Sequence, residues 1–279
     1  MPDVNFLCMN ANAYNKYGVE AALVGAARAR LPRVELTAVP GKSDFLRADM
    51  TDGDVDKAKA LLERNGVELV TVASHTNLLY PDGLSAMKNN LRLAERFGVG
   101  FVVTSVSYHP TGTLAGDEEK AEANLKAEAV YVDALQDVAA IASDLGIRVG
   151  IETHGFECAT GQDVLRLVNL VDRPNVGINY DTGNVVYYGG IAPYEDLQAC
   201  LHKVFGVHLK DKIGGRKVWN FPPIGQGELD MQRIMDTLRG VSGIPISIEI
   251  EFTEAGSSGP EEVHEAFVAS MAHLNSLAR

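Results

Sequence analysis

Short apolar runs alternate with longer amphipathic stretches from one end of the chain to the other. The short runs have the length and composition of strands in a parallel sheet, and the amphipathic stretches between them have the length of helices. Eight strands are predicted, at residues 4–9, 33–39, 67–73, 101–106, 147–152, 176–180, 204–209 and 246–250.

The amphipathic stretches carry apolar residues at three- and four-residue spacing, which predicts helices. The clearest cover residues 54–66, 83–98 and 117–146. Each of these three ends in a glycine (Gly66, Gly98 and Gly146) that stands directly before the β-branched residue opening the next strand. A glycine in the left-handed conformation at this position would end the helix and release the chain into the strand.

Repeated strand-helix units of this kind close naturally into a barrel, so we predict a single (β/α)8 TIM barrel of the α/β class. A doubly wound open sheet is the alternative, but the segment "ANAYNKYG" after the first strand lacks the glycine-rich phosphate turn of that fold. The length of 279 residues is usual for one such barrel, and no linker rich in proline or serine interrupts it. We therefore expect residues 1–279 to form one domain.

Charge and cysteine usage exclude several classes of partner. The formal net charge of -12 provides no basic surface for a nucleic acid backbone. The three cysteines lie far apart with no CxxC pair, which is typical of a reducing compartment. The first residues, "MPDVNFLCMN", do not have the pattern of a signal peptide, and no apolar run is long enough for a membrane span. We expect a cytoplasmic protein that binds a small molecule and neither nucleic acid nor membrane.

Potential metal ligands stand at the ends of the last four predicted strands. Glu152 ends the fifth strand, Asp181 follows the sixth, and His208 lies near the end of the seventh. The eighth strand supplies Glu249 and Glu251, which point to the same side because side chains alternate along a strand. Alternation alone does not choose between these two glutamates, and we favour Glu249. In a TIM barrel all of these side chains would face one shared mouth.

Three carboxylates and one imidazole form a mostly hard ligand set, which suits a divalent cation: Mn²⁺ first, with Mg²⁺ or Co²⁺ as alternatives. Without a cation, the clustered carboxylates would repel one another. The alternative is that these residues have a structural role only. Glu152 would then pair with a neighbouring Lys or Arg, and His208 would be a buried histidine with its hydrogen bonds made inside the protein. Because four successive strands each end in a potential ligand, we favour the metal site.

The segments "VGIETHG", "NVGINYDTGN", "VFGVHLKDK", "PPIGQGELD" and "ISIEIEF" together resemble the xylose isomerase-like TIM barrel family. That family includes sugar phosphate isomerase/epimerase-like proteins and the ketose 3-epimerases. The resemblance implies that Glu152, Asp181, His208 and Glu249 are the metal ligands. It also implies that Glu152 and Glu249 are the catalytic acid/base pair, and that the protein is a homodimer or homotetramer, as family members often are.

A divalent cation that chelates a substrate carbonyl and its neighbouring hydroxyl would acidify the adjacent C–H bond and stabilise an enediolate. Two carboxylates on opposite faces of that carbon would then remove and return the proton. We therefore expect an isomerase or epimerase of a small carbohydrate or sugar acid. The alternative is a lyase that uses the same site, as a decarboxylase, a dehydratase or an oxo-sugar or C-glycoside lyase. A third interpretation is a barrel that binds a ligand without converting it. The opposed pair of glutamates argues against this interpretation, because a binding protein does not need two bases.

Other polar residues near the strand ends are candidates for substrate binding. Asn184 stands where ketose 3-epimerases usually have a histidine, and Lys210, Lys212 and Arg216 are cations that would suit a substrate carboxylate. Each has a structural alternative as a loop residue or an ion-pair partner. The predicted substrate-binding residues are His154, Lys210, His75, His109, Asn184 and Arg216.

Three further residues have two open interpretations each. Glu35, inside the second strand, is either a site residue or a member of a buried salt bridge. Trp219 and Phe221, in the loop after the seventh strand, either cover the substrate or anchor that loop on the barrel rim.

Overall fold

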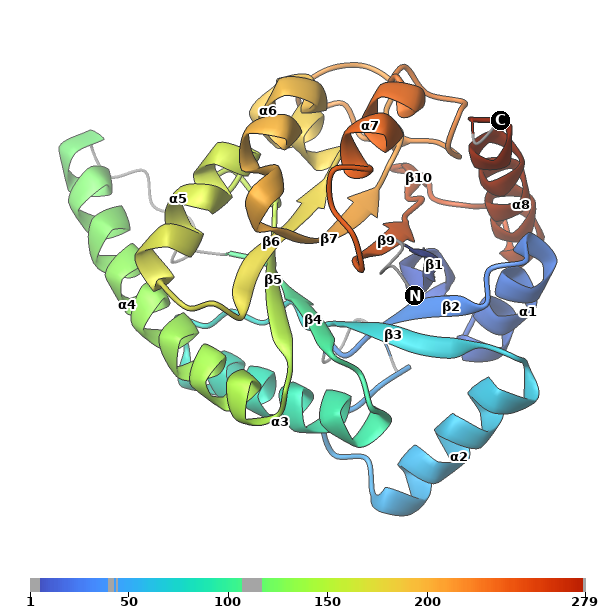
Figure 1. Cartoon of the computed structure of the whole chain (residues 1–279), viewed down its shortest axis with the longest axis horizontal. Helices are drawn as coiled ribbons and strands as arrows, with labels where there is room; N and C mark the ends of the chain where they lie inside the picture. Colours follow the sequence, from blue (N-terminus) through green and yellow to red (C-terminus); the bar gives the residue numbers. More distant parts are fainter. Residues whose placement is uncertain (1–5, 40–42, 44, 107–116, 278–279) are drawn as a thin grey trace.

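The computed structural model of the chain describes residues 6–39, 43, 45–106 and 117–277. Eight parallel strands form a closed barrel in which the order along the chain is also the order in space (Figure 1). The last barrel strand pairs with the first and so closes the ring. This confirms the predicted TIM barrel and all eight predicted strands. The barrel strands are β1 (Phe6–Asn10), β2 (Arg33–Thr37), β3 (Glu68–Ala73), β4 (Phe101–Thr104), β5 (Arg148–Glu152), β6 (Val176–Asp181), β7 (Val204–Leu209) and β9 (Pro245–Ile248).

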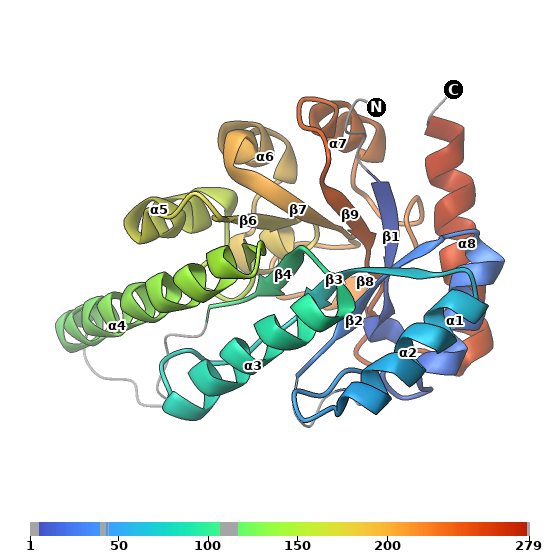
Figure 2. The same cartoon turned by 60° about the horizontal axis from the view of Figure 1, so that its bottom comes forward.

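Helices surround the barrel on its outer side (Figures 1 and 2). The predicted helices end as expected, because Gly66, Gly98 and Gly146 all have positive φ, at 65°, 77° and 68°. Among the described residues, no helix is long and apolar enough to cross a membrane. The helices are α1 (Val19–Ala29), α2 (Asp52–Arg64), α3 (Pro81–Phe97), α4 (Asp117–Asp144), α5 (Gly161–Val171), α6 (Pro193–Cys200), α7 (Met231–Leu238) and α8 (Pro260–Leu277), with short helical turns at Ala11–Tyr14, Val185–Gly189 and Leu201–Lys203.

The barrel interior is packed tightly around the ring of Phe101. A β-carbon built on Gly150 would lie 2.6 Å from this ring, and one built on Gly206 would lie 2.4 Å from it. Only glycine at these two positions leaves room for the aromatic ring inside the barrel. This packing fills the interior between β4, β5 and β7, while the polar side chains described below stand near the carboxyl ends of the strands.

A small antiparallel sheet that the sequence pattern does not predict joins two loops at the mouth of the barrel. Its strands are β8 (Asn220–Phe221), after β7, and β10 (Phe252–Thr253), after β9. Each strand has only two residues, which is too short for alternation to show. Phe221 is buried against Trp219 and Tyr187. Of the two interpretations of Phe221, the structure therefore agrees with an anchor for the loop.

Candidate metal centre

Four side chains from successive barrel strands converge at the mouth. Glu152 ends β5, Asp181 ends β6, His208 lies on β7, and Glu249 directly follows β9. Each offers a potential ligand atom, and these atoms all lie within 4.8 Å of one another. All four residues are buried. We call Glu152, Asp181, His208 and Glu249 the strand-end group.

The imidazole of His208 has a defined orientation within this group. Its Nδ1 atom lies 3.0 Å from Oε2 of Glu249, 3.3 Å from Oε1 of Glu152 and 4.0 Å from Oδ2 of Asp181. Its Nε2 atom lies 2.9 Å from Oε1 of Glu35, on the opposite side of the ring. Nδ1 is therefore the nitrogen that faces the other members of the strand-end group.

Glu35 is held by three partners in the barrel interior. Besides the contact with His208, its carboxylate accepts hydrogen bonds from Nδ2 of Asn10 at 3.0 Å and from Oγ of Ser247 at 2.8 Å. Of the two interpretations of Glu35, the structure shows the buried ion pair. This pair orients a member of the site, because an Nε2–H group that donates to Glu35 leaves Nδ1 free to bind a cation.

The segment "DTGN" after β6 is a turn that builds part of the site. Oδ1 of Asp181 accepts hydrogen bonds from the backbone N–H groups of Gly183, at 2.9 Å, and Asn184, at 2.8 Å. This leaves Oδ2 of Asp181 to face the strand-end group. The side chain of Asn184 then donates from Nδ2 to Oε1 of Glu152 at 3.0 Å. One turn therefore orients carboxylates from two neighbouring strands.

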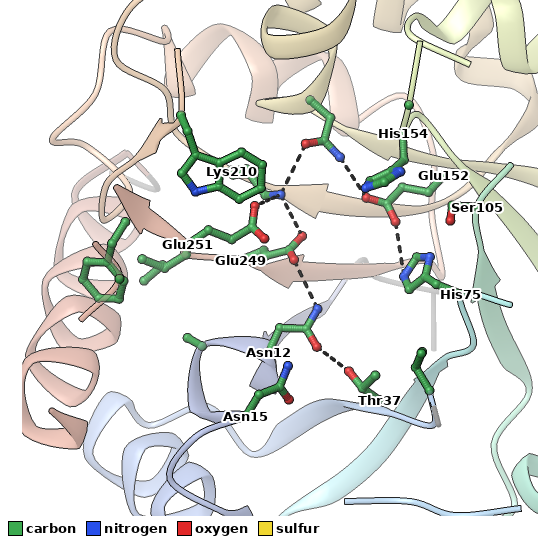
Figure 3. A pocket seen from close by; sticks show the side chains of 18 of the residues that line it. Asn12, Asn15, Thr37, His75, Ser105, Glu152, His154, Lys210, Glu249 and Glu251 are labelled. Atoms are coloured by element: carbon green, nitrogen blue, oxygen red, sulfur yellow. Dashed lines mark hydrogen bonds and ion pairs between the residues drawn. The ribbon is translucent and has the colours of Figure 1, made fainter. Parts of the chain in front are cut away.

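Lys210 brings a buried ammonium group to the same place. Its Nζ atom lies 3.0 Å from Oδ2 of Asp181. It also lies 3.3 Å from Oε2 of Glu249 and 2.9 Å from Oε2 of Glu251 (Figure 3). The structure thus separates the two glutamates that alternation leaves equivalent. Glu249 lies in the strand-end group, and Glu251 lies beyond it as a partner of Lys210.

The charges of the group perturb its pKa values. Although burial acts to lower the pKa of His208, the carboxylates of Glu35, Glu152 and Glu249 hold it well above its ordinary value. Burial, together with the charges of Glu249 and Glu152, raises the pKa of Asp181 to about 7 in spite of Lys210. Without a divalent cation, Asp181 and His208 therefore retain protons at a pH where these groups would ordinarily have lost them.

The strand-end group fits a divalent cation. Within the described part of the chain, Oδ2 of Asp181, Nδ1 of His208 and Oε2 of Glu249 are buried and make ion-pair contacts but no hydrogen bond of regular geometry. Buried polar atoms of this kind are rare unless a ligand or water completes them. Three carboxylates and one imidazole are donors that manganese, magnesium, cobalt and zinc ions accept.

A cavity of about 740 Å³ opens above the group. His75 and His154 line it, as the sequence predicts, with Nε2 of His75 at 3.4 Å from Oε2 of Glu152 and Nε2 of His154 at 3.3 Å from the hydroxyl of Tyr188. Asn184 and Lys210 also line it. The cavity is therefore a polar chamber with the strand-end group at its base.

Two predicted substrate-binding residues are not among the described residues that line this chamber. Arg216 is exposed and absent from the described lining, and it donates from Nε to the backbone oxygen of Tyr188 at 3.0 Å. His109 lies outside the described residues. Roles for Arg216 and His109 in substrate binding stay predictions.

Lys212 is buried away from the cavity, where its ammonium donates to the backbone oxygens of Ile213 and Gly214 at 2.5 Å and 3.0 Å. The ammonium of Lys212 therefore stabilises the loop that follows β7. Among the described lining residues, the lysines are Lys16 and Lys210.

Asn12 and Tyr188 also line the cavity, although the sequence pattern does not predict them. Asn12 donates from Nδ2 to Oε1 of Glu249 at 3.3 Å and accepts a hydrogen bond from Thr37. The signal for Asn12 is its place just beyond β1, because the rule applied to the last four strands holds for the first strand as well. Tyr188 follows a turn after β6 and has no comparable signal in the sequence.

The closed barrel and the polar group at its mouth define the class of protein, and the chain belongs to the xylose isomerase-like TIM barrel family, whose sequence profile matches residues 26–277. Inosose dehydratase from Geobacillus kaustophilus (strain HTA426) is 37% identical over 81 residues, which are 29% of this chain and 26% of that protein. The matched segments span 26% to 41% of the lengths of the curated relatives.

Solved structures share the fold over nearly the whole chain. A D-tagatose 3-epimerase-like protein has a TM-score of 0.76 at 18% identity and covers 98% of this chain and 97% of its own. The IOLI protein with a bound zinc atom has a TM-score of 0.74 at 18% identity and covers 97% of this chain and 98% of its own. At this level of identity, the likeness shows the fold alone.

Proposed function

We propose that this protein is a divalent-metal-dependent isomerase or epimerase of a small carbohydrate or sugar acid. The arrangement of Glu152 and Glu249 carries the proposal. They come from β5 and β9, on either side of β6 and β7, and each has one oxygen within 3.3 Å of Nδ1 of His208. The second oxygen of Glu152 contacts His75, and that of Glu249 contacts Asn12. Two bases on opposite sides of one site suit removal and return of a proton.

Glu152, Asp181, His208 and Glu249 would hold the cation. When bound, a divalent cation polarises a substrate carbonyl and stabilises the negative charge that develops on its oxygen. We expect manganese first, and loading with manganese, magnesium, cobalt and zinc in turn tests this order. The cavity binds the substrate above these four residues, with the reacting carbon between the two glutamates.

Glu152 is in the ionised form that a base requires. Burial acts against its ionised form, but the nearby imidazoles of His208 and His75 lower its pKa to about 2, so it is a carboxylate at neutral pH. Glu249 is likewise ionised, because Lys210 and His208 hold its pKa well below the ordinary value in spite of burial. One carboxylate removes the proton. The other, which is also ionised, first takes up a proton from solvent and then delivers it to the opposite face of the carbon.

Polar groups around the chamber would orient the substrate. His75, His154, Asn184 and Lys210 offer donors and acceptors for hydroxyl groups, and Tyr188 supplies an aromatic wall beside His154. The barrel strands hold the strand-end group rigidly, whereas the loops that follow them carry most of these contacts.

A dehydratase is the second candidate. It is favoured by the identity with inosose dehydratase over 81 residues and by Asn184, which replaces the histidine usual in ketose 3-epimerases. The first step is the same, because removal of a proton beside a carbonyl also precedes the loss of a β-hydroxyl group.

The test is turnover of a panel of free ketohexoses, oxo-sugar acids and inososes in D₂O. The protein is first stripped by a chelator and then reloaded with one metal at a time. An isomerase or epimerase incorporates one solvent deuterium and leaves the product otherwise unchanged in mass. A dehydratase releases water and gives an unsaturated ketone. If no substrate is converted by any reloaded form, the proposed function is wrong.

Variants make this test specific. Glu152→Gln and Glu249→Gln each remove one proton-transferring group, and we expect turnover to fall by roughly 10²–10⁴-fold in both. A parallel assay on DNA with an abasic site tests the expectation that nucleic acid is not a substrate. Gel filtration tests the expectation of a homodimer or homotetramer, and cell fractionation tests the cytoplasmic location.

A further inference from the structure

The ammonium group of Lys210 and a bound cation would share two oxygen atoms. Nζ of Lys210 lies 3.0 Å from Oδ2 of Asp181 and 3.3 Å from Oε2 of Glu249. Within the described residues these same two oxygens make ion-pair contacts but no hydrogen bond of regular geometry, and they face the strand-end group. Since a divalent cation held by them would repel a nearby ammonium strongly in this buried site, the ammonium has to move aside when the cation binds.

The surroundings of Lys210 restrict where the ammonium can go. Its side chain is only 2% exposed. The aliphatic stem lies on the turn at Gly183, where an added β-carbon would be 3.0 to 3.1 Å from three stem carbons. The ring of Phe221 lies 4.9 Å from Nζ on another side. The stem is therefore confined, and the ammonium can shift only over a short distance among its existing partners.

Glu251 is the charged partner of Lys210 outside the strand-end group. Its Oε2 atom accepts a hydrogen bond from Nζ at 2.9 Å, and its side chain is 27% exposed toward the cavity. A carboxylate in this position can keep its ion pair with the ammonium while Asp181 and Glu249 bind a divalent cation. Lys210 also lies 3.5 Å from Oδ1 of Asn184, which is neutral and holds an ammonium less strongly.

The small sheet at the mouth keeps Glu251 in place. Phe252, the next residue, pairs with Phe221 across β8 and β10 and has a φ of 61°, which is uncommon for a non-glycine residue. The same sheet thus positions both the carboxylate that accepts from the ammonium and the aromatic ring beside it. This gives a role to an element that the sequence pattern does not predict.

We propose that Glu251 is a positioning residue for Lys210: it holds the ammonium group away from Asp181 and Glu249, so that the strand-end group can bind its divalent cation. The inference rests on the metal site of the proposed function. Lys210 stays protonated throughout and changes only its partner. Glu251 need not contact the cation at any stage.

Isothermal titration of chelator-stripped protein with Mn²⁺ tests this at one fixed pH. We expect Glu251→Gln to weaken Mn²⁺ binding by roughly tenfold. Lys210→Met should tighten binding, because the competing charge is gone. In the Lys210→Met background, Glu251→Gln should then change the affinity by less than about twofold.

The double variant separates this role from simple attraction between Glu251 and the cation. If Glu251→Gln weakens binding equally with and without Lys210, the carboxylate acts directly on the cation and the proposal is wrong. It is also wrong if Glu251→Gln alone leaves the affinity unchanged. Glu254→Gln is the matched control, because Glu254 lines the same cavity without a described contact to Lys210.

Affinity is measured here without any substrate, so the outcome is independent of turnover. A protein that binds Mn²⁺ as expected but converts no sugar would contradict the proposed function and leave the role of Glu251 supported. Thermal unfolding of each metal-free variant shows whether the fold is retained.

Discussion

Nε2 of His208 lies 2.9 Å from a carboxylate oxygen of Glu35, and both side chains are only 1% exposed. The two residues come from β7 and β2, on different sides of the barrel. Because a hydrogen bond from Nε2 fixes the tautomer and the ring plane, Glu35 decides which nitrogen faces the strand-end group. A residue outside the described lining of the cavity thus controls the geometry of a potential ligand.

Replacing Glu35 tests this control. We expect Glu35→Gln to weaken the binding of Mn²⁺ by about 10- to 100-fold, since the uncharged amide orients His208 less firmly and no longer raises its basicity. Titration calorimetry gives the affinity. Glu68→Gln, on β3, is the control, because its carboxylate pairs with Arg33 on the exposed surface, and it should leave the affinity unchanged. Equal affinities in the wild type and Glu35→Gln would contradict the role of Glu35.

Removing a central carboxylate should abolish cation binding without unfolding the barrel. In Asp181→Asn, an amide oxygen can still accept from the N–H groups of Gly183 and Asn184, so the turn is retained. The variant lacks the negative charge that the cation needs. Elemental analysis should find about one cation per chain in the wild type and almost none in the variant. A full complement of metal in Asp181→Asn would remove Asp181 from the site.

Cation binding should strengthen as the pH rises from about 6 to about 8. The carboxylates around His208 hold its pKa well above the ordinary value against the effect of burial, and burial raises the pKa of Asp181 to about 7. Both groups therefore carry a proton at the lower pH, and the cation must displace it. Each released proton makes the apparent affinity rise by up to tenfold per pH unit.

Calorimetry in buffers with different ionisation enthalpies counts the released protons. A cation affinity that is independent of pH, with no proton released, would show that Asp181 and His208 are already deprotonated in the metal-free protein.

Thr182 should contribute to stability through its hydroxyl group. This group donates to the backbone oxygen of Lys210 at 2.7 Å and accepts from the backbone N–H of Lys210 at 2.9 Å, entirely within the core. Thr182→Val leaves both backbone groups unpaired and should lower the free energy of unfolding by about 2–3 kcal/mol. Denaturant unfolding measures the difference.

Thr71 offers a matched control, because its buried hydroxyl has no hydrogen-bond partner within the described residues. Thr71→Val should be neutral or slightly stabilising. A similar loss in both variants would show that the change of side-chain shape, and not the hydrogen bonds of Thr182, causes the effect.

The periodic pattern of apolar residues in the sequence is sufficient to predict most strands and helices of the barrel. Strand and helix periodicities are local properties, and a glycine such as Gly98 ends a helix through its own backbone freedom, so both can be predicted from neighbouring residues. The strand-end rule also selects Glu152, Asp181 and His208, because closure of the barrel brings the carboxyl ends of its strands together.

The sequence by itself therefore determined the eight strands, the order of the barrel and three members of the strand-end group, Glu152, Asp181 and His208. Tertiary structure alone decided between Glu249 and Glu251, paired Arg216 with the backbone oxygen of Tyr188 and placed Glu35 behind His208. It also paired β8 with β10. The physical reason is that these outcomes depend on contacts between residues far apart in the chain, whose distances and directions are set only when the barrel closes.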